Sequence, residues 1–165
     1  MISTLLAEHP GLARGGVALV LIMAPFVAGW LFPRKRVAWA LVYLSAAAIA
    51  ALTLIPDGAR TVAGCELQFS PADLLGVEPL ANLVLFVPLA LALTALTERP
   101  LPAFLVGLGV SAAIELVQWA APAIGRSCTS TDFIANTVGA ALGAALAALG
   151  LYIARRRAQR TVPRR

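Results

Sequence analysis

The chain has 165 residues, of which 60% are hydrophobic and 13% charged, and its mean hydropathy is +0.86. In soluble domains about a quarter of the residues are charged, so this composition excludes an ordinary soluble protein. It indicates an integral membrane protein of one domain. The formal net charge of +5 is compatible with a nucleic-acid partner, but the basic residues cluster beside apolar segments, as membrane topology requires. We therefore expect no nucleic-acid partner.

The first apolar run covers residues 16–32 and follows a short polar tail, residues 1–15. An uncharged run of this length can cross a hydrocarbon core of about 30 Å. A signal peptide is the alternative, but the strong basic cluster follows the run instead of preceding it, and no small-x-small cleavage site ends it. A retained first transmembrane helix is therefore the better interpretation.

Four further apolar runs follow the first one. They cover residues 37–55, 80–97, 103–121 and 132–153. The lengths predict an all-α membrane protein in which about five transmembrane helices form a single domain, residues 1–153, followed by a basic tail, residues 154–165.

The long loop between the second and third spans contains the pattern of a helix start. Ser70 can cap a helix, Pro71 suits the first helical position, and Asp73 places an acid three residues after the cap. Because Gly76 follows closely, we expect only a short interfacial helix in this loop.

The distribution of Lys and Arg predicts the orientation of the spans. Basic residues crowd the turn after the first span, residues 34–36, and the tail after the last span. With the N-terminus outside and the C-terminus cytoplasmic, ten of the 13 Lys and Arg residues lie on the cytoplasmic side, in accordance with the positive-inside rule. The arginine tail then suits the anionic lipid of the inner leaflet.

This orientation places both cysteines, Cys65 and Cys128, outside the membrane. Thiols on that side can be oxidised, so we expect a disulfide that pins the long loop over the turn carrying Arg126. The alternative is a pair of thiols that never meet, because the separation of the two Cα atoms decides whether a bridge can form.

Six polar residues of the spans and turns are expected to converge on the outer third of the bilayer. They are Asn82, Glu115, Gln118, Arg126, Asp132 and Asn136. A carboxylate at Glu115 is costly in hydrocarbon and must face protein, water or a partner. Arg126 is the nearest basic candidate on that side, and the six together predict a ligand-binding site.

Helical spacing groups these residues further, and each has a plainer structural explanation. Ser111, Glu115 and Gln118 follow the i, i+4, i+7 spacing that places them on one helix face, and Ser111 alone is an ordinary small packing residue. Asp132 with Thr129 matches a cap-plus-acid pattern at the start of a helix.

The three amides have their own structural alternative, which is hydrogen bonding between helices. Arg126 alone would be an ordinary interfacial arginine. A short repeat supports the site reading, since Glu78 to Asn82 and Asp132 to Asn136 both have an acid followed, four residues later, by asparagine.

Gly139 and Gly143 form a GxxxG step on the last span. Small residues at this spacing let helices approach closely, so a homo-oligomer through these two glycines is a further expectation. Other chemistries are poorly served: the sequence offers no His or Cys cluster for a metal and no GxSxG elbow, and we expect neither metal nor cofactor.

Three segments carry a resemblance to a known family. They are the Asn82-Leu-Val-Leu-Phe-Val-Pro88 run, the segment from Ser111 to Gln118 with its Glu-x-x-Gln, and the series Arg126, Asp132, Asn136, Gly139 and Gly143. On these residues the chain resembles the VanZ-like family of small bacterial membrane proteins. One departure is Ala90, where the family usually has Gly.

The resemblance implies a multi-pass protein of the bacterial cytoplasmic (inner) membrane. The family's namesake gives low-level resistance to the glycopeptide antibiotic teicoplanin, so the resemblance raises a link to such resistance as an expectation.

The leading functional hypothesis is a cell-envelope protein that binds a polar lipid headgroup or a glycopeptide-like ligand in an outer-leaflet pocket. Arg126 would meet an anionic group of the ligand. An enzyme of the hydrolase or transferase class, acting on a lipid-linked envelope precursor, is the rival, with Glu115 and Asp132 as candidate catalytic acid and base. A transporter is a third reading, for which Pro88 in the third span is a mild indication.

Overall fold

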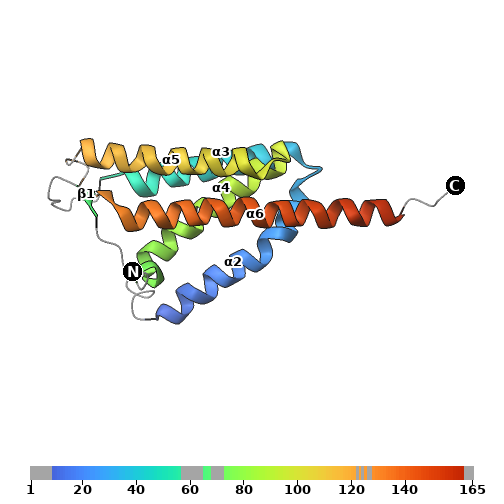
Figure 1. The fold of residues 1–165 in the computed structure, drawn as a ribbon, viewed down its shortest axis with the longest axis horizontal. Coiled ribbons are helices and arrows are strands. Elements are labelled where there is room, and N and C mark those ends of the chain that lie inside the picture. The colour runs from blue at the N-terminus through green and yellow to red at the C-terminus, as the bar shows by residue number, and fades with distance from the viewer. Residues whose placement is uncertain are drawn as a thin grey trace.

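The computed structural model describes residues 9–56, 65–67, 73–121, 123, 125 and 128–161. Within these residues, five helices are long and apolar enough to cross a membrane (Figure 1). They are α2 (Pro10–Leu31), α3 (Lys35–Leu54), α4 (Val77–Thr97), α5 (Pro100–Ala120) and α6 (Ser130–Thr161). The expected all-α membrane bundle of about five spans is confirmed.

All five helices begin before their predicted spans, and α2 and α6 differ most from them. Helix α2 begins at Pro10, so residues 10–15 are helical instead of forming a polar tail. Proline is well tolerated at the first position of a helix, and the helix continues through Gly11, Gly15 and Gly16 into the apolar run. Helix α6 continues to Thr161 through most of the expected basic tail, because the Ala and Arg residues after its last apolar turn favour helix.

Short elements fill the long connections. A single turn of 3₁₀ helix, η1 (Asp73–Leu75), stands where a short helix was expected, and the capping residues Ser70 and Pro71 lie outside the described residues. Strands β1 (Cys65–Glu66) and β2 (Cys128–Thr129) pair in parallel, with Cys65 opposite Cys128 and Glu66 opposite Thr129. The loop and the last turn are therefore joined by backbone pairing.

Helix α4 is the most buried span and α2 the most exposed. One apolar cluster joins α4 to α3, α5 and α6 around Phe86, Ile49, Ile114 and Ala140. A second cluster holds the C-terminal half of α2, from Ala24 to Leu31, against α4, α6 and α3. Helix α2 crosses the bundle obliquely, and its N-terminal half diverges from α6 (Figure 1).

Helices α4 and α6 pack directly on each other, with backbones in close contact. A Cβ atom added at Gly139 or Gly143 would meet the carbonyl oxygen of Leu83 or Val87. The GxxxG step is thus occupied inside the chain. Both glycines are covered by α4 within the chain, and the homo-oligomer expected through them stays a prediction.

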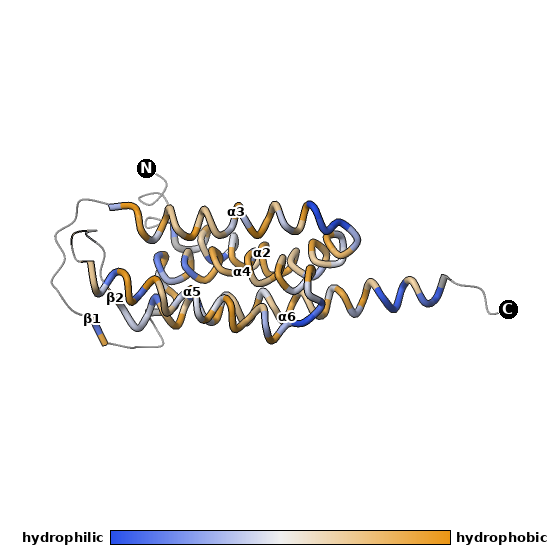
Figure 2. Tube along the Cα trace, turned by 90° about the horizontal axis from the view of Figure 1, so that it is seen from above, coloured by the Kyte–Doolittle hydropathy of each residue, from blue (hydrophilic) through white to orange (hydrophobic). Residues whose placement is uncertain are grey.

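Polar residues gather at the two ends of the bundle, with apolar residues between them (Figure 2). We call one the disulfide end, defined by β1, β2 and the adjoining ends of α4, α5 and α6. We call the other the basic end, defined by residues 34–36, residues 98–99 and the last two turns of α6. The short turns of the basic end leave each pair of connected helices antiparallel.

An ion-pair cluster that the sequence pattern does not predict holds the basic end together. Glu98 pairs with Arg155 of α6, and its second oxygen lies 3.8 Å from Lys35 Nζ. Lys35 also donates to the carbonyl oxygens of Ala95 and Leu96, at 2.9 and 3.1 Å, at the end of α4. Two turns of the chain and the last part of α6 thus meet at Glu98.

Candidate functional site

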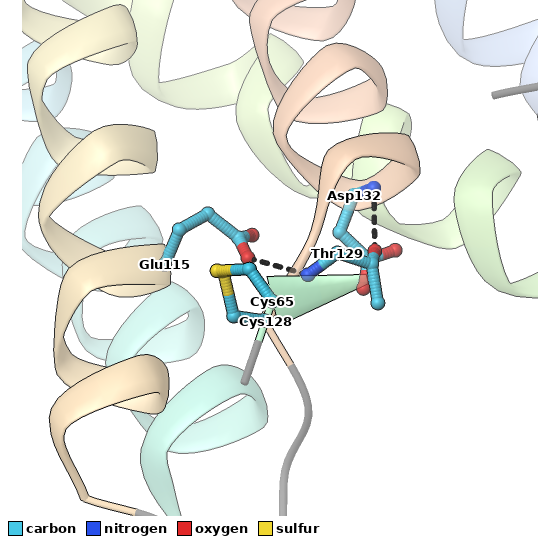
Figure 3. Close-up of a disulfide and its surroundings, with 5 residues drawn as sticks. All are labelled: Cys65, Glu115, Cys128, Thr129 and Asp132. Atoms are coloured by element: carbon cyan, nitrogen blue, oxygen red, sulfur yellow. Dashed lines mark hydrogen bonds between the residues drawn. A yellow bond between two sulfur atoms is a disulfide. The ribbon is translucent and has the colours of Figure 1, made fainter. Parts of the chain in front are cut away.

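A disulfide between Cys65 and Cys128 closes the disulfide end (Figure 3). The two Cα atoms are 4.6 Å apart, within the range that disulfides span. The expected bridge is confirmed. It holds β1 against β2, and the next residue of β2, Thr129, leads directly into α6.

Thr129 connects the two acidic residues of the site. Its Oγ1 accepts a hydrogen bond from the backbone N–H of Asp132 at 3.0 Å, which caps the start of α6. Its own backbone N–H donates to Glu115 Oε2, also at 3.0 Å (Figure 3). In a complete capping box the acid three residues after the cap would accept that N–H. Here an acid from α5 takes this place.

The carboxyl group of Asp132 is therefore available for a hydrogen bond with another helix. Its Oδ1 accepts a hydrogen bond of 2.7 Å from Asn82 Nδ2 of α4, and the pair is partly buried. The predicted cap pattern is correct for Thr129, whereas the aspartate links α4 to α6. The two halves of the repeat are not equivalent, since Asn82 is partly exposed whereas Asn136 is buried.

We expect the Asn82–Asp132 bond to show energetic coupling. A double-mutant cycle of Asn82→Ala and Asp132→Ala should give an interaction energy of about 0.6 kcal/mol, the average for hydrogen bonds between membrane helices. The measurement is reversible unfolding in detergent micelles. Pairing Asn82→Ala with Thr97→Ala at the basic end provides the control, for which the two effects should add.

Gln118 and Glu115 are both buried, at 7% and 8% exposure, on the face of α5 that the spacing predicted. Gln118 Nε2 donates to the carbonyl oxygen of Thr53 at 3.0 Å, near the end of α3. Thr53 turns its own hydroxyl back to Ile49 O at 2.7 Å. Sequence reasoning missed Thr53, because an isolated threonine in an apolar run gives no sign of which helix lies beside it.

Ser111 and Asn136 lie deeper in the bundle, at 0% and 2% exposure. An added Cβ at Gly107 of α5 would meet the side chain of Ala140 on α6, and because these helices are antiparallel, Ser111 and Asn136 share the next level toward the disulfide end. Within the described residues, three buried oxygen atoms have no hydrogen-bond partner at this end of the bundle: Ser111 Oγ, Gln118 Oε1 and Asn136 Oδ1. Buried polar atoms are rarely left in this state.

The structure thus brings together five of the six predicted site residues. They come from the first turns of α4 and α6 and the last turns of α5: Asn82, Glu115, Gln118, Asp132 and Asn136. Arg126, the sixth, lies outside the described residues. The contact made by Glu115 is with the Thr129 amide, and the binding role of all six stays a prediction.

The polar atoms of the site are mainly hydrogen-bond acceptors, namely two carboxyl groups and the unpartnered oxygen atoms. Within the described part of the chain there is no group of three His, Cys, Asp or Glu residues that could hold a metal ion. The arrangement is therefore suited to hydrogen bonding with a polar molecule. The two carboxyl groups on either side of Thr129 are the only candidates for acid and base chemistry that the sequence analysis named.

Five apolar helices with polar residues at both ends define this chain as a multi-pass membrane protein. The sequence model of the VanZ/LLP1 family matches residues 17–152, which is most of the chain. The chain therefore belongs to the VanZ/LLP1 family, and the expected family membership is confirmed. No curated protein and no solved structure matches it.

Proposed function

We propose that the disulfide end binds a polar group of a cell-envelope molecule, either a lipid headgroup or a glycopeptide-like ligand. The observation that carries this proposal is the set of buried oxygen atoms without a partner on Ser111, Gln118 and Asn136. In a membrane bundle such atoms destabilise the fold unless a donor reaches them. They belong to the same end of the bundle as the carboxyl groups of Glu115 and Asp132, which accept hydrogen bonds from Thr129 and Asn82.

The proposed orientation has the disulfide end outside a bacterial inner membrane. Two independent features support it: the basic end carries the arginines that the positive-inside rule assigns to the cytoplasm, and a disulfide persists in an oxidising compartment. The ligand would then approach from the outer leaflet.

Among the described residues of this end, most polar atoms are hydrogen-bond acceptors. They favour a ligand that donates hydrogen bonds, such as one with hydroxyl, amide or ammonium groups. Arg126 precedes Cys128 by two residues in the sequence and would add a cation for an anionic group of the same ligand. Family membership supports testing teicoplanin as one such molecule, together with a role in resistance to it.

The test uses variants that separate binding from stability. Ser111→Ala and Asn136→Leu each remove a buried oxygen atom that has no partner, so stability should be unchanged or higher. Binding of teicoplanin, or of vesicles containing phosphatidylethanolamine, should weaken about 3- to 10-fold for each lost hydrogen bond. The measurements are thermal unfolding in detergent and titration of purified protein reconstituted in nanodiscs.

Thr94→Val is the matched control, because Thr94 is a fully buried residue of α4 whose hydroxyl also has no partner but lies toward the basic end. It should leave binding unchanged. If Ser111→Ala and Asn136→Leu raise stability and bind both probes as well as the unaltered chain, the polar atoms are a packing defect and the proposed site is wrong.

A further inference from the structure

Helix α6 is much longer than the membrane it crosses. Its 32 residues rise about 48 Å at 1.5 Å per residue, against a hydrocarbon core of about 30 Å. The start of α6 is fixed at the disulfide end by the Thr129 cap, so the excess lies at the other end. Figure 1 shows the last turns of α6 extending past the neighbouring helices, and Figure 2 shows that these turns are hydrophilic.

The extension has two different faces. Arg155 faces the bundle and pairs with Glu98. The other face carries a stripe of five residues that line a shallow hollow of about 440 Å³: Tyr152, Ile153, Arg156, Arg157 and Arg160. Within the described residues, the three arginines of this stripe make no ion pair with an acidic side chain. The hollow is therefore cationic, and no acidic side chain of the described part of the chain neutralises it.

We propose that this stripe is a binding site for the headgroup of an anionic phospholipid in the adjacent leaflet. The charge is complementary to a phosphate diester, and three guanidinium groups offer the forked donors that phosphate oxygens accept. The site is separate from the disulfide end and does not depend on the function proposed there.

The order of residues along α6 matches the depth of a lipid molecule. Tyr152 and Ile153 directly follow the last buried residue of the helix, Leu151, so they lie where the acyl chains meet the headgroups, a level that tyrosine favours. Arg156 to Arg160 rise about 6 Å further, which is about the thickness of one headgroup layer.

Tyr152 also orients the first arginine of the stripe. Its hydroxyl oxygen accepts a hydrogen bond of 3.0 Å from Arg156 Nε, and the guanidinium carbon lies 5.1 Å from the centre of the tyrosine ring. The two terminal nitrogens of Arg156 take no part in this hydrogen bond, so they can donate to a ligand. A cation held over an interfacial aromatic ring is a prepared contact for a phosphate group at that depth.

The experiment measures lipid retention by native mass spectrometry of the purified full chain with phosphatidylglycerol or phosphatidylcholine. We expect phosphatidylglycerol to be preferred about tenfold or more, because each basic residue near an anionic surface contributes separately to binding. The R156Q/R157Q/R160Q variant should lose most of this preference. These side chains are exposed, so the variant should fold, and the intact disulfide and thermal unfolding check that it does.

The control variant R14Q/R36Q/R99Q removes the same net charge from exposed positions outside the stripe and should keep most of the preference. If it loses as much as the stripe variant, the effect is general charge and the site does not exist. Unchanged lipid retention by the stripe variant, together with loss of binding to a single-stranded RNA, would also overturn the proposal.

Discussion

Replacing Gly143 or Gly139 by alanine is expected to cause a large loss of stability. At either position the new Cβ would lie well inside 3.0 Å of a backbone carbonyl oxygen of α4. That oxygen belongs to a helix and cannot rotate away as a side chain can. Overpacking of this kind costs about 1 to 3 kcal/mol or more, which outweighs the gain of up to about 1 kcal/mol in helix propensity.

Gly109 of α5 provides the matched control, since an added Cβ there meets nothing within 4 Å. Gly109→Ala should therefore leave stability unchanged or raise it slightly. The measurement is thermal unfolding in detergent followed by size-exclusion chromatography. Equal stability of Gly143→Ala, Gly139→Ala and Gly109→Ala would show that α4 and α6 do not touch at these glycines.

The spans themselves were predictable because each is a long apolar run with at most one charged residue, and hydrocarbon requires the backbone to satisfy its own hydrogen bonds as a helix. The ends of α2 and α6 were predicted less well. Hydropathy marks where a helix leaves the lipid, whereas the backbone of α6 continues through polar residues that favour helix. The basic tail was therefore expected at residue 154 although the helix runs to Thr161.

The candidate site was predicted in its membership but not in its pairings. Helical spacing placed Glu115 and Gln118 on one face, and both are buried. The hydrogen-bond partners of these side chains depend on which helices lie beside α5, and residue spacing along the sequence does not give this information. Glu115 thus meets the amide of Thr129, and Gln118 meets Thr53 of α3, a helix that contributes no predicted site residue.

The role of Gly139 and Gly143 shows the same limit. A GxxxG step predicts that another helix approaches closely, but it does not indicate whether that helix belongs to the same chain. The structure assigns the step to α4. The glycines therefore hold together the two helices that carry Asn82 and Asp132, which makes the packing of the core a condition for the site.

Reducing the disulfide is expected to have the second large effect. The bridge closes a loop with a sequence separation of 63, for which chain entropy predicts about 4 kcal/mol in a soluble protein. Here the spans between the two cysteines restrict the unfolded chain while they remain in the membrane, so we expect about 2 to 4 kcal/mol. Thermal unfolding in detergent with and without a reductant measures this loss.

The C65S/C128S variant separates the loss of the bond from other effects of the reductant. It should unfold at the lower temperature of the reduced chain and should not respond to reductant. A further drop on adding reductant would mean that the reagent acts elsewhere, since both cysteines of the chain are in the bridge.

The same bridge can test which end of the bundle faces outward. After reduction in intact cells, a maleimide that cannot cross the membrane should label Cys65 or Cys128 from outside, because both lie at the disulfide end. The alternative orientation would place the arginines of α6 outside and the disulfide in the reducing cytoplasm, against two separate physical preferences. Labelling only after the membrane is permeabilised would favour that orientation, and the acceptor-rich cluster around Thr129 would then face the cytoplasm instead of an envelope ligand.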